Sequence, residues 1–141
     1  MKLKSVLGLL LLTFVLQSCN DNIRTPLNVV DTKPPMRAVY SEIQSRIFNA
    51  KCTTSGCHGP NEAFPNLTIG NSYSDLTSKK SPLFGVIAIK PGDADNSNFI
   101  KKLLGTASGE IMPTKSSGFS TLSKSEIDSI KTWVNNGAIN N

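Results

Sequence analysis

Apolar and polar positions alternate most regularly near the C-terminal end of the chain. Helical spacing there predicts one apolar face made of Ile127, Ile130, Trp133 and Val134. Ser123 and Glu126 stand where the two halves of a capping box would satisfy the first amide groups of a helix. Gly137 stands where a left-handed residue commonly follows a helix. The pattern therefore predicts a helix that starts after Ser123 and ends just before Gly137.

Two more helices are predicted from the spacing of apolar residues. Over residues 39–51, apolar side chains recur every fourth position from Val39 to Ile47. A second apolar face is expected over residues 98–104, where Gly105 should end the helix. That face consists of Phe99, Ile100, Leu103 and Leu104.

The remaining segments of the domain indicate little regular structure. Residues 72–77 fit a short helical turn, and the apolar run 83–89 is too short to distinguish a strand from a helix. Gly and Pro are frequent in residues 53–71 and 105–121, which predicts loops. The pattern as a whole therefore favours short helices joined by long loops.

The first eighteen residues have the pattern of an export signal. Lys2 and Lys4 precede an apolar run over residues 6–16. That run is shorter than the roughly 20 residues that a membrane-spanning helix needs, so it predicts a signal peptide. Residues 16–19, Leu-Gln-Ser-Cys, resemble the lipobox of bacterial lipoproteins, in which the cysteine is lipidated and becomes the new N-terminus. The alternative is an ordinary secretory signal followed by an incidental Cys19.

Composition and charge narrow the class of the mature protein. The chain has 141 residues, which suits one domain with a short appendage. Cleavage before Cys19 removes two lysines, so the net charge falls from +5 to +3. This small excess, without a basic tract, argues against a nucleic-acid partner. The hydrophobic content of 38% predicts a thin core, which favours an added cofactor or cross-link.

We predict three parts of the chain. They are a signal peptide over residues 1–18, a lipidated cysteine with a flexible tether over 19–38, and one domain over 39–141. The tether is rich in Asn, Asp, Thr and Pro and has no apolar period, which is typical of a linker. Alternatively, the apolar residues within 27–30 dock on the domain as a short strand. Export also places the domain in an oxidising compartment.

The candidate chemistry lies where Cys52 and Cys57 are followed directly by His58. Two thiols with an adjacent histidine form the arrangement that attaches haem c. The thiols bond to the two vinyl groups of the porphyrin, and the histidine is held under the iron. Four residues separate the cysteines here, whereas the common motif has two. This departure concerns the maturation route and the fine geometry more than the assignment.

Three other roles compete for the same residues. A disulfide between Cys52 and Cys57 would suit the oxidising compartment but leaves His58 unexplained. A zinc site would lack a fourth Cys or His ligand, because His58 is the only histidine. A catalytic Cys–His pair is disfavoured because both cysteines share one tight segment in an oxidising space.

Residues 39–141 resemble the small bacterial cytochromes c that carry one haem. The order of parts is that of the family, since a helix leads to Cys52, Met112 lies in a late loop, and Trp133 belongs to the final helix. The segment 90–97 also looks like exported bacterial cytochromes with the four-residue spacing. The resemblance implies an all-α cytochrome c fold. Three to five short helices and long loops would wrap around one covalently attached haem c.

The second axial ligand of the iron follows by elimination. His58 is the only histidine, so ligation by two histidines of this chain is impossible. Met36 and Met112 are the methionines that remain after signal cleavage. Met36 lies in the tether close before Cys52, whereas Met112 precedes Pro113, which favours an extended backbone. We expect Met112 to bind the iron. The alternative is that Met112 fills a gap in the core and the iron stays open.

These expectations define a function and its alternatives. Ligation by histidine and methionine raises the reduction potential and closes the iron, which suits electron transfer rather than catalysis. We expect a membrane-anchored electron carrier, not an enzyme, in the cell envelope, facing the periplasm or the cell surface. Its partners would be redox proteins. The alternatives are an open-iron haem protein that senses a gas or acts as a weak peroxidase, and a non-haem lipoprotein with a disulfide.

Two further sets of side chains bear on this prediction. The doublets Lys79–Lys80 and Lys101–Lys102 would either steer an acidic redox partner or form ordinary solvated surface. The apolar side chains expected to pack in the core around the haem are Ile43, Ile47, Phe48, Leu67, Phe99, Leu103, Phe119, Ile130 and Trp133.

The lipobox predicts that Cys19 carries the membrane anchor. Cys19→Ala should abolish acylation and either release a soluble form or leave the signal uncleaved, because no thiol remains to accept the lipid. Membrane fractionation and uptake of labelled fatty acid measure the effect. A variant that fractionates and takes up label like the wild type would contradict the lipobox.

Overall fold

The computed structural model describes residues 34–141, except residue 55. The signal peptide, Cys19 and most of the predicted tether therefore lie outside the described residues. The described part of the chain belongs to one compact unit. No helix within it is long and apolar enough to cross a membrane.

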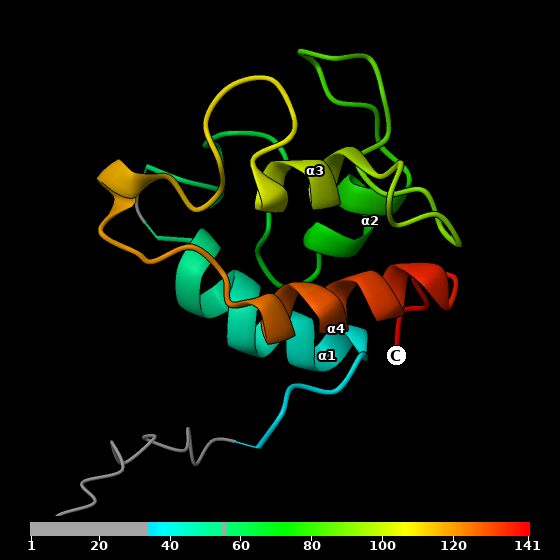
Figure 1. Ribbon diagram of the computed structural model, residues 1–141. Helices are drawn as coiled ribbons and strands as arrows, with labels where there is room; N and C mark the ends of the chain where they lie inside the picture. Colours follow the sequence, from blue (N-terminus) through cyan, green and yellow to red (C-terminus); the bar gives the residue numbers. More distant parts are fainter. Residues whose placement is uncertain (1–33, 55) are drawn as a thin grey trace, which may run out of the picture. The chain divides into compact units, whose positions relative to one another are not determined.

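Helices provide the regular structure of this unit (Figure 1). In chain order they are α1 (Tyr40–Ile43), η1 (Gln44–Cys52), α2 (Ser72–Thr77), α3 (Asn98–Leu104), η2 (Lys115–Ser117) and α4 (Lys124–Asn135). The described residues contain no strand, only an isolated antiparallel bridge. The all-α class is therefore confirmed. The short η2 interrupts a segment that the sequence predicted to be loop throughout.

The helix α4 begins and ends as its capping signals predict. The Ser123 hydroxyl accepts a hydrogen bond from the Glu126 amide, and the Glu126 carboxylate accepts one from the Ser123 amide. At the other end, Gly137 has φ of 93°, a left-handed conformation that favours glycine. The amide that follows Gly137 then donates to the carbonyl of Trp133 at 3.0 Å.

The first predicted helix is present, but most of it is wider than an α-helix. The single turn α1 continues directly into η1, a π-helix in which bonds join residues five apart. Its last turn is closed by the Thr53 amide, which donates to the Phe48 carbonyl at 3.0 Å. A four-residue apolar spacing does not separate the two helix types. The consequence for the site is that Cys52 is the last residue of this helix.

The two short central helices, α2 and α3, are also present where they were predicted. Gly105 ends α3 with φ of 71°. The helix buries Ile100 and Leu103, whereas Leu104, expected on the same apolar side, is 46% exposed. Adjacent helical residues point about 100° apart, so a helix that buries Leu103 in a narrow contact turns Leu104 toward solvent.

The apolar run 83–89 forms neither a strand nor a helix. It belongs to a loop that is closed by the isolated bridge and by a 2.8 Å bond from the Ser81 amide to the Val86 carbonyl. Leu83 at its tip is 85% exposed, whereas Ile89 at its end is fully buried in the core. One end of the run is therefore an exposed loop tip and the other end is part of the core, so the run does not form one strand or helix.

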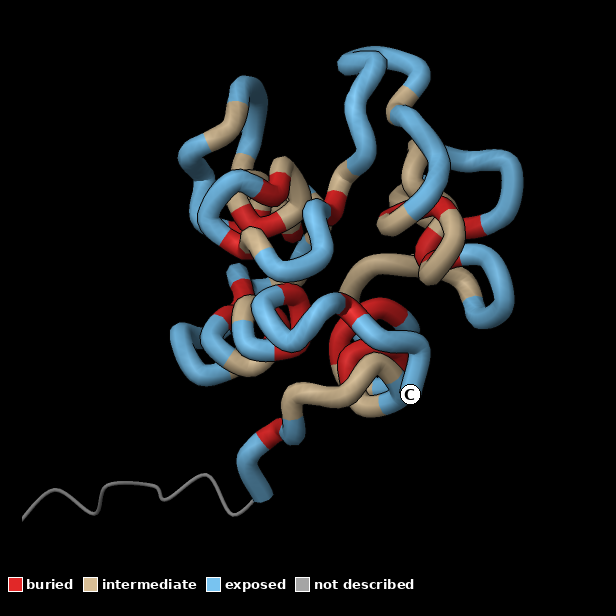
Figure 2. The backbone as a smooth tube through the Cα atoms, turned by 90° about the vertical axis from the view of Figure 1, so that its right-hand side faces the viewer, coloured by how far each residue is buried: buried red, intermediate tan, exposed pale blue. Residues whose placement is uncertain are grey.

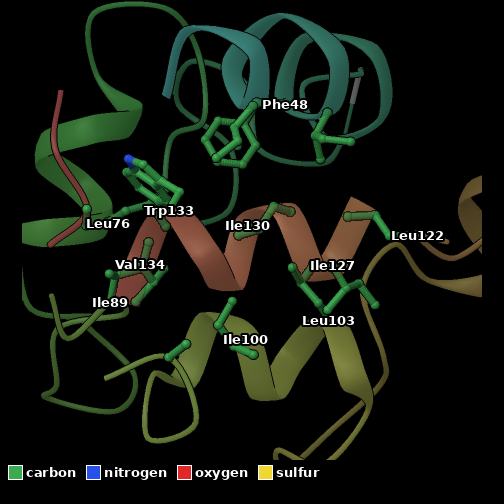
Figure 3. Close-up of a cluster of buried hydrophobic side chains, with 14 of the residues drawn as sticks. Phe48, Leu76, Ile89, Ile100, Leu103, Leu122, Ile127, Ile130, Trp133 and Val134 are labelled. Atoms are coloured by element: carbon green, nitrogen blue, oxygen red, sulfur yellow. The ribbon is translucent and has the colours of Figure 1, made fainter. Parts of the chain in front are cut away.

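The core forms where α4 packs between the α1–η1 helix and α3 (Figures 1 and 3). Phe48 points toward α4 from one side, and Ile100 and Leu103 from the other (Figure 3). Trp133 of α4 also lies against Tyr40, with ring centroids 5.7 Å apart. Buried segments gather at these contacts, and the surrounding loops are exposed (Figure 2).

Most of the expected core residues are buried, namely Ile43, Ile47, Phe48, Leu67, Leu103, Ile130 and Trp133. Phe99 is half-buried and packs edge-on against Phe48, with centroids 5.8 Å apart. Phe119 is also half-buried and lies outside the core cluster, contrary to expectation. Met36 belongs to the core although the sequence placed it in the tether. It is 8% exposed, and its carbonyl accepts a 2.8 Å bond from the Ser129 hydroxyl.

Candidate functional site

A cavity of about 630 Å³ brings together the residues that the sequence singled out in this domain. Its lining includes Cys52, Cys57, His58 and Met112, although Met112 lies 54 positions after His58 in the chain. Apolar side chains complete much of the wall, among them Leu67, Leu83, Phe84, Val86, Phe99 and Leu103. Cavities of this size and apolar character are typical of small-molecule and cofactor sites in proteins.

Backbone hydrogen bonds hold the Cys–His segment against the end of η1. The His58 amide donates to the Cys52 carbonyl at 3.0 Å, which folds the loop back on the helix. The His58 carbonyl in turn accepts from the Leu67 amide at 2.8 Å. These bonds hold the segment that contributes both cysteines and the histidine to the lining of the cavity.

Met112 reaches the cavity from another part of the chain. It lies in the loop after α3, and its amide donates to the Lys102 carbonyl of that helix at 3.1 Å. Its side chain is half-buried and packs against the core. The helix α3 therefore positions Met112, just as η1 positions Cys52.

The hydrogen bonds of His58 define its tautomer. Its Nδ1 lies 2.9 Å from the Pro65 carbonyl and 3.1 Å from the Ala63 carbonyl. Carbonyl oxygens only accept, so Nδ1 carries the proton and donates it. In the neutral ring the other nitrogen, Nε2, then holds a free lone pair, as a metal-binding histidine requires.

The thiols of Cys52 and Cys57 are not joined by a disulfide. Burial raises the pKa of Cys52 to about 12, and the neighbouring Lys51 charge offsets only part of this effect. Cys52 is therefore a neutral thiol at pH 7, which does not suit a thiolate nucleophile. Within the described residues, moreover, no three His, Cys, Asp or Glu side chains gather as a metal-ion site.

Glu62 is a site residue that the sequence analysis missed. Its carboxylate accepts hydrogen bonds from the Gly56 amide at 2.6 Å and from the Gly59 amide at 2.9 Å. It therefore bridges the backbone on both sides of the Cys57–His58 pair. A Cβ on Gly59 would lie 2.7 Å from the carboxylate, so glycine permits this close approach. Nothing in the sequence distinguishes Glu62 from an ordinary surface acid.

Asp75 of α2 is a second missed residue. Its side chain is only 6% exposed, and it accepts a 3.0 Å bond from the Asn66 amide. Lys79 pairs with it, with 2.6 Å between the lysine nitrogen and a carboxylate oxygen. Aspartate side chains are mostly exposed in proteins, and here the loop that carries Asn66 contacts Asp75 and helps to bury it.

The lysine doublets do not surround the cavity evenly. Lys101 and Lys102 belong to its lining. Lys102 also donates to the Ser108 carbonyl at 2.6 Å, so it secures the loop that leads to Met112. Lys79 and Lys80 are not among the lining residues.

Comparisons with known protein families, with curated proteins and with solved structures find no match for this chain. Its function is therefore inferred from the residues themselves.

The Glu62 bridge should depend on pH. The Gly56 and Gly59 amides hold the pKa of Glu62 below its usual 4.5. A carboxylate whose pKa is lower in the folded state contributes its full stabilisation at pH values above its unfolded-state pKa. That contribution is lost as the pH falls through its folded-state pKa. Hydrogen exchange at Gly56 and Gly59 should therefore speed up relative to the unfolded chain on acidification below pH 4.5. Glu62→Gln keeps only one acceptor oxygen, so one of the two amides should lose its partner already at pH 7.

Glu110→Gln provides the matched control, because it makes the same chemical change at an exposed position. It should keep wild-type exchange at both glycines. Equal protection of Gly56 and Gly59 in Glu62→Gln and wild type across the pH range would contradict the bridge.

Proposed function

We propose that this protein is a membrane-anchored electron-transfer protein of the cytochrome c class, with one covalent haem. The observation that carries the proposal is the shared cavity, whose lining combines two thiols and an imidazole from residues 52–58 with the thioether of Met112. These four groups are the set that haem c attachment and His/Met ligation require.

The chemistry of the donor set fits this cofactor. Cys52 and Cys57 would hold the porphyrin through thioether bonds, in which each sulfur adds to one vinyl carbon and the thiol proton goes to the other. His58 presents a free Nε2, since its Nδ1–H is occupied by backbone carbonyls. Met112 offers a neutral sulfur, which favours reduced iron.

The walls of the cavity also fit an apolar plate. Leu83 and Phe84 line it while remaining 85% and 58% exposed. Solvent-exposed apolar side chains clustered at a cavity are typical of a ligand site. If a porphyrin bound in the cavity, these side chains and the porphyrin face would shield each other from water.

Electron transfer accounts for this arrangement better than catalysis. A haem held by these residues would supply one-electron chemistry between a reduced donor protein and an oxidised acceptor protein. With His58 and Met112 on the iron, no coordination position remains for a substrate. The protein then needs only to hold its two ligands rigidly, which the bonds to backbone groups around His58 and Met112 support.

The sequence pattern of the N-terminal segment supports a location at a membrane. The lipid on Cys19 and the tether that follows would hold the domain in the cell envelope, facing the periplasm or the cell surface. Confinement near a membrane raises the effective concentration of redox partners there. Donor and acceptor would be redox proteins, and nucleic acid has no role in this proposal.

Covalent haem tests the proposal directly. Wild-type protein made in a host with cytochrome c maturation should keep its haem through acid–acetone extraction, because thioether bonds survive it. Cys57→Ser and His58→Ala should yield little holoprotein, whereas Cys52→Ser should keep one thioether and some haem. Mass and absorption spectra of the purified proteins measure this. A wild-type protein without haem and with a Cys52–Cys57 disulfide would overturn the proposal.

Met112 and Met36 provide a matched pair of variants for the second ligand. Met112→Leu removes the sulfur at similar size, so the far-red band of oxidised iron–methionine ligation should disappear and the reduction potential should fall. Carbon monoxide should then bind readily. Met36→Leu changes the same atoms outside the cavity lining and should leave all three properties unchanged.

An unchanged spectrum and potential in Met112→Leu would show that Met112 is not the ligand. Ready binding of carbon monoxide by the wild type would favour the open-iron alternative over the carrier.

A further inference from the structure

Asp75 is a buried carboxylate that the proposed function leaves unexplained. Taking a charge out of water is unfavourable unless hydrogen bonds and an opposite charge compensate it. Here the Asn66 amide and Lys79 provide that compensation. An uncharged side chain at this position of α2 would need no such compensation. We therefore ask what the negative charge of Asp75 does.

The bond that Asp75 accepts leads directly to His58. The Asn66 amide, which donates to Asp75 at 3.0 Å, and the Pro65 carbonyl, which accepts from His58 Nδ1 at 2.9 Å, belong to one peptide group. A single peptide unit therefore connects the carboxylate to the imidazole. Hydrogen bonds in such chains polarise one another, most strongly in a low-dielectric interior.

The direction of this polarisation is determined by chemistry. A negative charge at the amide end draws the peptide proton toward itself and increases the negative charge on the Pro65 carbonyl oxygen. The bond from His58 Nδ1–H to that oxygen then strengthens, and the ring becomes more electron-rich. Carbonyl and carboxylate partners of this kind raise the basicity of metal-binding histidines.

We propose that Asp75 is a positioning residue that acts on His58 through the Pro65–Asn66 peptide and lowers the reduction potential of the bound haem. The inference rests on the proposed function, because it assigns His58 to the iron. Lys79 offsets part of the charge of Asp75. Its own side chain is 57% exposed, however, so solvent screens it more than it screens the carboxylate.

A purely structural role for Asp75 makes a different prediction. If the side chain only fixes the loop over α2, any acceptor at the same place would serve. Asp75→Asn keeps a carbonyl oxygen that can accept from the Asn66 amide and removes the negative charge. This substitution therefore separates the loop-fixing role from the electrostatic one.

The experiment uses the haem-loaded full-length protein and two readouts. Asp75→Asn should raise the reduction potential and move the His58 Nδ1 proton resonance of the reduced protein upfield, because its hydrogen bond weakens. Lys79→Gln, at a more exposed position, should shift both readouts in the opposite direction. It also decides the question if Asp75→Asn does not fold.

Asp128→Asn is the matched control, since Asp128 pairs with Lys124 at the same helical spacing on α4. It should leave both readouts as in wild type. If the wild type carries haem but both readouts stay unchanged in Asp75→Asn and Lys79→Gln, the role of Asp75 is wrong, whereas the proposed function is unaffected. A changed potential with an unmoved His58 resonance also overturns it, because the charge then acts through space. A wild type without covalent haem removes the proposed function and the inference together.

Discussion

The packing of α4 between the α1–η1 helix and α3 is the contact on which the candidate site depends (Figure 3). The helix η1 ends at Cys52, and α3 anchors the loop of Met112, so this contact determines how far apart the two side chains lie. Isolated helices of these lengths are marginal in water, and most of their stability comes from burying apolar faces. Loss of the contact would therefore remove two walls of the cavity together with the core.

The thin core and the apolar cavity have the same cause, which is that short helices bury few apolar side chains. The helices are short, and the long loops between them contribute few buried side chains. The apolar residues of the loop tip, Leu83 and Phe84, face the cavity rather than the core. A cofactor that fills the cavity would extend the core to them, which is how a small domain gains buried area without more residues.

The loops around His58 are held by specific polar contacts in place of regular structure. Buried or crowded backbone amides need partners, and here carboxylates provide them. Glu62 bridges Gly56 and Gly59, and Asp75 receives the Asn66 amide. The Pro65–Asn66 peptide takes part in both, since its amide donates to Asp75 and its carbonyl accepts from His58 Nδ1. Fold and candidate chemistry are thus coupled at the level of single peptide units.

The sequence by itself determined the features that depend on neighbours within a few positions. Apolar spacing and capping residues predicted α3 and α4. Both signals depend only on side chains three or four residues apart in the sequence. The adjacent Cys57 and His58 likewise predicted the candidate site. The π-helical η1 was not visible in the same way, because an apolar repeat does not specify the backbone bonds.

Only the tertiary structure decided which distant groups meet. It moved Met36 into the core and left Phe119 outside the core. It also buried Asp75 and directed Glu62 to two glycine amides. The contacts of Asp75 and Glu62 rest on hydrogen bonds to backbone groups, which every residue carries, so side-chain identity along the chain does not predict the partner. Long-range packing selects it.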